Sequence, residues 1–417
     1  MDYNQLLNGC GEIGRCMLSS GAEIYRVEDT VRWILSSYCV NGDVWAIPTQ
    51  LIVSLTDDAG RSYTRLYRTA PASIDIEAIE RFNALSRAIC ADPPPPERLV
   101  DMARETRALC RVYSTKLLLL GCLLGAFFFT LFFQGRLLEA SVAALAGAAA
   151  GLCSHELDRI KINFFFKTIA SALVLGLVIY GLCALGLPIN TGVTGIGALM
   201  VLIPGLIFTN FMSDLITSET LSGVTTFIRA VLTVAALVIG TGLALYLFKA
   251  PGLSVEGSAH VADYGPLLQC GISFLACLGF CLMYNVHGWG IILCCIGGAL
   301  GWGTYLAAGA LTDSIYICSL FAAVMIAIYA EVMARLRKYP ITAYLVVSYF
   351  PLVPGTYIYY AMYNSIHGDW RSALNSGTQA IGLAACLAMG TLLVSTAVRI
   401  FSARRMEKRR RNAKPVR

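Results

Sequence analysis

The dipeptide Pro-Gly occurs twice inside long apolar stretches, at positions about 150 residues apart. The first, Pro204-Gly205, lies in GALMVLIPGLIFTNFMSD, and the second, Pro354-Gly355, lies in VVSYFPLVPGTYIYYAMYN. Proline lacks a backbone N–H and glycine loosens the chain, so each pair is predicted to break or kink its helix. Hydrophobic segments interrupted at matching places in two halves of a chain indicate the binding site of a secondary transporter.

The likeness between the two stretches extends beyond the Pro-Gly pairs. The residues that match after them, in the same order, are Met212 and Met362, Asp214 and Asn364, and Ser222-Gly223 and Ser376-Gly377. The shared order and spacing favour an internal duplication over a chance similarity between apolar helices.

Charge is distributed unevenly along the chain. Only 14% of the 417 residues are charged, whereas a soluble domain carries about a quarter. Residues 1–115 hold a normal mix of charges, and residues 116–402 hold very few. We therefore expect a soluble N-terminal domain followed by a polytopic membrane domain. The first residues lack a basic segment with an apolar core behind it, so no signal peptide is predicted and the soluble domain is expected in the cytoplasm.

The apolar region predicts about ten membrane-spanning helices. Their expected cores are residues 116–134, 138–154, 166–186, 191–211, 225–248, 266–284, 288–309, 314–333, 341–361 and 378–401. Basic residues gather in alternate connections and in the tail SARRMEKRRRNAKPVR, which predicts a plasma-membrane protein with both termini in the cytoplasm. Next to a final membrane helix, the tail is interpreted as a topology signal or a contact with anionic membrane lipid, and no nucleic-acid partner is expected.

Five helices in each half is an odd number, so the two halves would cross the membrane in opposite directions. The predicted fold is therefore a polytopic α-helical membrane protein with about ten transmembrane helices in a 5+5 inverted-topology repeat, preceded by a cytoplasmic α+β domain. The expected domains are the cytoplasmic domain at 1–115, the first membrane repeat at 116–250, the second at 251–402 and the basic tail at 403–417.

Ionisable groups at membrane depth are costly and are usually functional. Asp214 follows the first Pro-Gly in a stretch without basic residues, and Asn210 lies one turn before it. An aspartate at the edge of a broken helix can take up a proton when burial disfavours its charged form. Arg229 begins the fifth span and can pair with Asp214 or bind a substrate carboxylate, for which its forked geometry is suited. The alternative is that Asp214 is a helix-end residue at the water interface.

The second half offers different groups at the matching places. Asn364 replaces the aspartate, and Gln379 opens the last span. We expect these two residues to contribute to the substrate or coupling site, and the proton site to lie in the first half. Glu331, shortly before Arg335, is interpreted as an interfacial ion-pair residue more readily than as a coupling carboxylate. The ninth span is rich in tyrosine, and some of these hydroxyls are candidates to line a wet path.

The soluble domain reads as a mixed α+β module. Residues 3–20, 22–37 and 75–91 are predicted as helices, residues 44–56 as one strand with Trp45, Ile47, Leu51, Val53 and Leu55 on one side, and residues 61–70 as a second strand. Its densest charge cluster is Arg26, Glu28, Asp29 and Arg32, for which a stabilising charge network is the default reading and gating or substrate capture the alternative. We find no nucleophile–base set, phosphate loop or metal-type cysteine spacing, so neither an enzyme nor a bound metal or cofactor is predicted.

Three stretches resemble the threonine/serine exporter family. SSGAEIYRVEDTV is similar to the signature near the start of that family, and LIPGLIFTNFMSDLITSETLSGVTTFIRA resembles its second signature. EVMARLRKYPITAYLVVSYFPLVPG resembles the smaller subunit of the split, two-chain members, so the chain follows the order of the fused single-chain form. The positions that match are Gly21, Arg26, Glu28, Asp29, Pro204, Gly205, Asp214, Arg229, Glu331, Pro340, Pro354 and Gly355. The departure is Thr217-Ser218-Glu219, where a Ser-Gly-Asp-like turn is expected.

The resemblance implies export of a small hydrophilic metabolite, driven by the proton gradient. Threonine or serine is the leading substrate and a dicarboxylate such as succinate the alternative, and the sequence does not choose between them. The expected substrate site lies between the two Pro-Gly-broken helices, whose Pro204, Gly205, Pro354 and Gly355 are the expected hinges. A membrane-anchored hydrolase and a channel or sensor are the alternatives of another class. The expected partners are the substrate, protons and membrane lipid, and homo-oligomer formation is left open.

Overall fold

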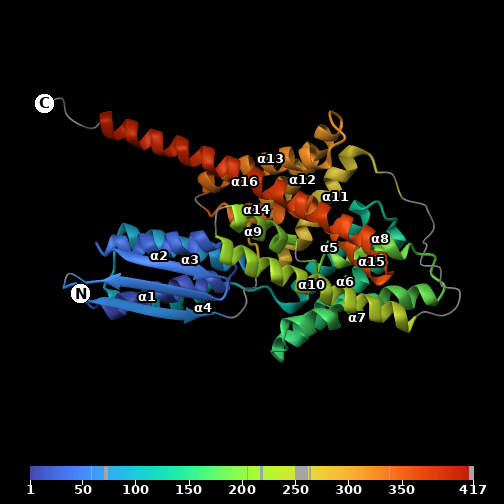
Figure 1. The fold of residues 1–417 in the computed structure, drawn as a ribbon, viewed down its shortest axis with the longest axis horizontal. Coiled ribbons are helices and arrows are strands. Elements are labelled where there is room, and N and C mark those ends of the chain that lie inside the picture. Colours follow the sequence, from blue (N-terminus) through green and yellow to red (C-terminus); the bar gives the residue numbers. More distant parts are fainter. Residues whose placement is uncertain are drawn as a thin grey trace.

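A computed structural model of the chain describes residues 1–57, 59–69, 74–203, 205–216, 219–248, 262, 264–337 and 339–412. Pro204, Thr217 and Ser218 lie outside the described residues. Figure 1 shows the two parts side by side along the longest axis: the N-terminal helices and strands at one end, and the helical bundle at the other.

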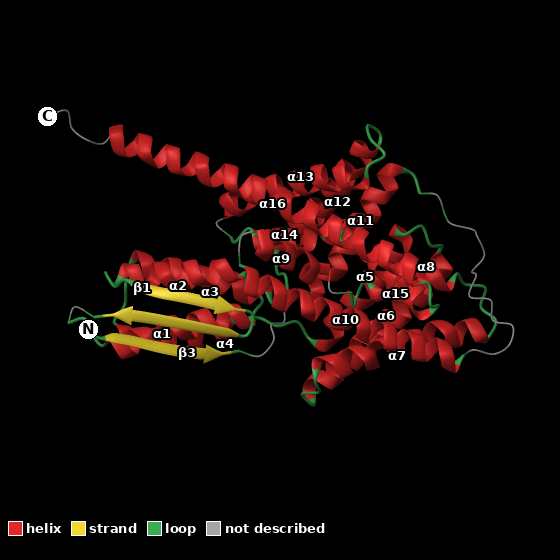
Figure 2. Ribbon diagram, in the orientation of Figure 1, coloured by secondary structure: helices red, strands yellow, loops and turns green. Residues whose placement is uncertain are grey.

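The N-terminal part is a three-stranded antiparallel sheet, in the order β1-β2-β3, packed with four helices (Figure 2). Its elements are α1 (Tyr3–Ser19), α2 (Ile24–Ser37), β1 (Gly42–Ile47), β2 (Gln50–Thr56), β3 (Ser62–Arg68), α3 (Ile76–Ala91), the short 3-10 helix η1 (Pro96–Arg98) and α4 (Leu99–Leu109). The apolar face expected on the second helix is present, because Ile24, Val27, Val31, Ile34 and Leu35 are all buried.

The prediction of one strand over residues 44–56 was wrong. The chain folds back at Pro48-Thr49, so this segment forms the hairpin of β1 and β2, with Ile47 opposite Gln50. Side chains of directly opposed residues lie on the same face of a sheet. Val44 is therefore buried opposite Val53, whereas Trp45, which was expected to point inward, is exposed opposite Ile52.

The second part is helical. Its elements are α5 (Thr115–Phe132), α6 (Leu137–Arg159), α7 (Phe164–Ala184), α8 (Thr191–Leu199), α9 (Gly205–Ile216), α10 (Thr220–Leu247), α11 (Pro266–Met283), α12 (Trp289–Gly309), α13 (Ile315–Arg337), α14 (Thr342–Ser348), the 3-10 helix η2 (Phe350–Leu352), α15 (Gly355–Ile366) and α16 (Trp370–Asn412). Within the described residues, eight helices are long and apolar enough to cross a membrane: α5, α6, α7, α10, α11, α12, α13 and α16.

The other two expected spans are each divided into short helices at the Pro-Gly pairs. The fourth expected span comprises α8 and α9, and the ninth comprises α14, η2 and α15. In both cases the helix after the break begins at the glycine, Gly205 or Gly355. The interruption predicted from the sequence is therefore present at both places.

Small residues allow the long helices to pack closely. α5 packs along α11, and a Cβ atom added to Gly279 of α11 would fall inside van der Waals distance of the backbone of Gly125 in α5. Glycines in α6 and α12 are buried in the same way: Gly147 lies against Ala126, and Gly298 lies against Cys277. Side chains at these places would separate the backbones.

The two broken segments touch each other at the centre of the bundle. A Cβ atom on Gly355, at the second break, would collide with the Met200 sulfur at the end of α8. A Cβ atom on Gly195 of α8 would lie 3.3 Å from the Tyr359 hydroxyl of α15. Direct contact between the two breaks leaves little space there in this conformation.

Asn285 joins the N-terminal part to the turn between α11 and α12. Its amide Nδ2 donates to Asp75 Oδ1 at 2.9 Å and to the Arg111 carbonyl at 2.7 Å, and its Oδ1 accepts from the Tyr113 backbone N–H at 3.1 Å. Asn285 is buried and has a positive φ of 58°, a conformation that asparagine tolerates better than most residues. This single side chain therefore binds α3, the α4–α5 linker and the α11–α12 turn together.

The α5–α11 crossing yields the first prediction. Gly279→Ala should destabilise the protein by about 1–3 kcal/mol because the new methyl group overpacks a backbone crossing. The measurement is the midpoint of thermal unfolding in detergent. Gly271→Ala, on the same helix with no atom within 4 Å of its added Cβ, is the matched control and should leave the midpoint unchanged or raise it slightly. Equal effects of the two substitutions would contradict the crossing.

The Asn285 contacts yield the second prediction. Asn285→Ala removes the half-buried hydrogen bonds that this side chain makes with Asp75, Arg111 and Tyr113, at a cost of about 0.5–1.5 kcal/mol each. The linker should open more often, so tryptic cleavage after Arg111 should become several-fold faster. Asn375→Ala, at an exposed position of α16, is the control. An unchanged cleavage rate in Asn285→Ala would show that this side chain does not hold the two parts together.

Candidate functional site

The residues predicted for the first half line a cavity of about 430 Å³ between the N-terminal part and the helical bundle. This volume lies within the range of about 300–1,000 Å³ that is typical of small-molecule sites. Its walls come from the α1–α2 turn, the β1–β2 turn, the start of α7, α9 and the first half of α10. Asn210, Asp214 and Arg229 all line it.

The spacing of polar residues in α9 and α10 explains why they reach this cavity. In α9, Ile207, Asn210 and Asp214 recur at helical spacing on the cavity side. Phe211, next to this face, is buried, and its ring centre lies 5.1 Å from that of Phe227 in α10. In α10, the cavity-lining residues recur at i, i+3, i+4 and i+7: Ser222, Thr225, Thr226 and Arg229. The two polar faces therefore form adjoining walls.

Asp214 and Arg229 place opposite charges on these walls. Asp214 Oδ2 accepts a hydrogen bond from Ser222 Oγ at 2.7 Å, which fixes the carboxylate between α9 and α10. The Arg229 guanidinium lies over the Phe164 ring, 5.1 Å from its centre. Among the residues that the structure describes, no carboxylate lies within 4.0 Å of Arg229, so of the two alternatives for Arg229 the ion pair with Asp214 is not formed in this structure.

The N-terminal part closes the cavity with the turn that carries the first predicted motif. Gly21 has a positive φ of 81°, which lets the chain leave α1 and enter α2 in a tight turn. Gly21 and Glu23 line the cavity, and Glu23 pairs with Arg26 at 3.6 Å. Glu23 Oε2 and Arg26 Nε are buried and have no hydrogen-bond partner in the described part of the chain. This pair is therefore held less tightly than an ordinary hydrogen-bonded ion pair.

Glu28 and Asp29 of the same motif do not line the cavity. Glu28 accepts a hydrogen bond from the Ala46 backbone N–H at 2.8 Å, which ties α2 to β1, and burial raises the pKa of its carboxyl group. Asp29 pairs with Arg32 at 3.1 Å. These contacts agree with the charge-network reading of the cluster.

The second-half candidates lie elsewhere. Asn364 in α15 and Gln379 in α16 are half-buried but do not line this cavity. Glu331 pairs with Arg335 at 3.2 Å near the end of α13, as expected of an interfacial residue. The structure therefore brings together the predicted polar residues of the first half and separates them from those of the second.

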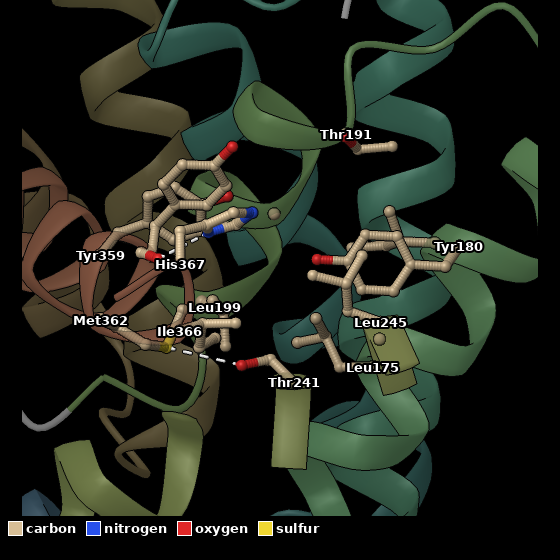
Figure 3. Close-up of a pocket in the computed structure, with 14 residues that line it drawn as sticks. Leu175, Tyr180, Thr191, Leu199, Thr241, Leu245, Tyr359, Met362, Ile366 and His367 are labelled. Atoms are coloured by element: carbon tan, nitrogen blue, oxygen red, sulfur yellow. Dashed lines mark hydrogen bonds between the residues drawn. The ribbon is translucent and has the colours of Figure 1, made fainter. Parts of the chain in front are cut away.

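Between the two broken segments, the described residues enclose a small cavity of about 20 Å³. It is lined mainly by apolar side chains, with hydroxyl groups from α7, α8, α10 and α15 and His367 at its edge. Figure 3 shows Tyr180 and Thr191 facing Tyr359 and His367 across it, above the contact of Thr241 Oγ1 with Met362 Sδ at 3.7 Å. This space suits one water molecule and is too small for an amino acid.

Several residues of these sites were missed from the sequence. Thr225 and Thr226 have a readable signal, because they share the helical spacing of Ser222 and Arg229. Phe164 has none, since it faces Arg229 only through tertiary packing. The fully buried Glu139 was also missed, although Arg136 lies three residues before it. It pairs with Arg136 and accepts from the Asn190 backbone N–H at 3.2 Å, which holds the connection into α8.

Comparisons with known proteins identify the family of the chain. A family model described as "Putative threonine/serine exporter" matches residues 8–248, which is more than half of the chain. A second model, described as "Threonine/Serine exporter, ThrE", matches residues 269–397. Searches of curated proteins and of solved structures gave no match. The two matches cover nearly all of the folded chain, in the order expected of a fused form, and show that the protein belongs to the threonine/serine exporter family.

Proposed function

We propose that this protein is a secondary active exporter of threonine or serine, and that the cavity between the N-terminal part and the bundle is its cytoplasmic binding site. The observation that carries the proposal is the pair of opposite charges, Asp214 and Arg229, on adjoining walls of one cavity. Family membership supports the transport class and the choice of substrate.

The lining chemistry matches a hydroxylated zwitterion. The forked Arg229 guanidinium suits the substrate carboxylate, and Asp214 suits the ammonium group. Thr225, Thr226 and Asn210 offer hydrogen bonds to a side-chain hydroxyl. A dicarboxylate would also satisfy Arg229, but its second carboxylate would meet Asp214 and Glu23 on the same walls, so the charge distribution favours the amino acid.

We infer that the membrane part is a 5+5 inverted repeat that starts at residue 116, with residues 1–115 forming the cytoplasmic domain and both termini in the cytoplasm. Packing supports this: α5 contacts α6 as α11 contacts α12, α7 contacts α10 as α13 contacts α16, and α6 contacts α8 as α12 contacts α14. The helix that follows each break also packs against the last helix of the other half: α9 contacts α16, and α15 contacts α10. Gly240 packs on α7 and Gly390 on α13, and they lie at the same 150-residue offset as the Pro-Gly pairs.

We infer that protons drive export through Asp214. Its carboxylate is only partly buried, so water in the cavity connects it to the cytoplasm. Asp214 would release its proton to the cytoplasm when the substrate ammonium binds. The path between the two breaks opens when Pro204-Gly205 and Pro354-Gly355 act as hinges and separate Met200 from Gly355. A proton entering from the outer side would then neutralise Asp214 and release the substrate, so that inward proton movement drives export.

Flux measurements test the transport proposal. Full-length protein in proteoliposomes should carry labelled threonine and serine in response to a pH gradient, and succinate much less. Asp214→Asn should still pass threonine down its own gradient but should no longer respond to the pH gradient. Asp101→Asn, at an exposed position of α4, is the control. Absence of pH-dependent flux of any of the three substrates would refute the proposal, and unchanged coupling in Asp214→Asn would remove this residue from the mechanism.

Binding measurements test the role of Arg229. Arg229→Lys keeps the positive charge but removes the guanidinium group that can donate two parallel hydrogen bonds to the substrate carboxylate. Loss of one charged hydrogen bond costs about 1.5–3 kcal/mol, so the Kd for threonine should rise at least about tenfold. Isothermal titration of the detergent-solubilised protein gives the Kd. Arg159→Lys, on the exposed end of α6, should bind as the wild type does. Wild-type affinity in Arg229→Lys would show that the carboxylate is bound elsewhere.

A further inference from the structure

A second cavity of substrate size lies beside the second break. It measures about 440 Å³ and opens between α5, α8, α11, α12, α13, α15 and α16. Pro354 and Thr356 at the start of α15 form part of its wall, and Trp302, Tyr305, Tyr357 and Tyr360 supply aromatic rings. Neither the family comparison nor the proposed cytoplasmic site accounts for it.

This cavity and the proposed cytoplasmic site occupy equivalent places in the two halves. Ile207 and Asn210, three and six residues after Pro204, line the first cavity, and Tyr357 and Tyr360, three and six residues after Pro354, line the second. The same face of each half-helix after a break therefore borders a cavity. If the halves are inverted, as proposed above, the second cavity opens toward the opposite side of the membrane. The contact of Met200 with Gly355 lies between the two breaks and closes the path.

The second cavity differs from the first in its chemistry. Among the residues that the structure describes, none with a charged side chain lines it, whereas the first cavity carries Asp214, Glu23 and Arg229. Trp302 is fixed in place, because its Nε1 donates to Gln269 Oε1 at 3.2 Å while Gln269 Nε2 donates to the Tyr264 carbonyl at 2.7 Å. Phe132 packs edge-on against Trp302 at 4.4 Å. The result is a rigid aromatic wall with hydroxyls at Thr356, Tyr357 and Tyr360.

We propose that this cavity is the outward-facing release site for the same amino acid, with the substrate ammonium held against the rings of Trp302, Tyr357 and Tyr360. Aromatic faces attract ammonium groups without a formal charge, and the interaction is weaker than binding by an ion pair. An exporter gains from this asymmetry, since a charged site captures the substrate inside and a neutral aromatic site lets it leave quickly outside. The inference rests on the proposed transport function.

Proteoliposomes in which all molecules have the same orientation allow the cytoplasmic and outer faces to be measured separately. Threonine counterflow gives one half-saturation concentration for threonine on the cytoplasmic face and one for the outer face. Tyr357→Ala combined with Tyr360→Ala should raise the outer value about tenfold, in line with cation–π energies of about 1–2 kcal/mol, and should leave the cytoplasmic value unchanged. Phenylalanine at both positions keeps the rings and should keep the outer value near that of the wild type.

Tyr246→Ala is the matched control, because Tyr246 lies near the end of α10, is 73% exposed and does not line the cavity. An unchanged outer value in the double alanine variant, with normal wild-type flux, would overturn the release site alone. A loss of outer affinity in the double phenylalanine variant equal to that in the alanine variant would overturn recognition by the rings. Absence of threonine flux in the wild type would overturn the proposed function and, with it, this inference.

Discussion

A helix interrupted at membrane depth leaves backbone N–H and C=O groups that lipid cannot satisfy, and the rest of this structure follows from that constraint. Such backbone is tolerated only where protein or a water-filled cavity surrounds it. At the first break, the N–H groups of Leu202 and Ile203 both bond to the Leu199 carbonyl at 2.8 Å, and at the second the Val353 N–H bonds to the Tyr349 carbonyl at 3.1 Å. Ile203 and Val353 are buried, so both breaks lie inside the protein.

Enclosing two breaks in one bundle requires close helix packing, which explains the many small residues. Glycines at the α5–α11, α7–α10 and α13–α16 crossings bring backbones together and leave the centre to the broken segments. The two breaks contact each other, and the cavity found between them measures only about 20 Å³. A larger cavity lies beside each break, which is the arrangement expected of a transporter held closed at its centre.

Local chemistry in the sequence predicted much of this architecture. The positions of both breaks follow from the missing N–H of proline, and the buried face of α2 follows from its periodicity. Features that depend on distant contacts were not predictable in the same way. The turn at Gly21 and Glu23 becomes a cavity wall because tertiary contacts, those of Asn285 among them, hold the N-terminal part against the bundle. Asn364 is separated from Asp214 by the packing of the two halves. Trp45 was assigned to the wrong face because a two-residue turn interrupts an alternation that looks continuous.

The central claim is that the transported amino acid binds between Arg229 and Asp214, in the cavity between the N-terminal part and the helical bundle. A structure of the full-length protein at saturating threonine tests it most directly. The account predicts density for threonine in this cavity, with the carboxylate at the Arg229 guanidinium and the ammonium group at Asp214. Density for threonine at another place, with this cavity empty, would contradict it.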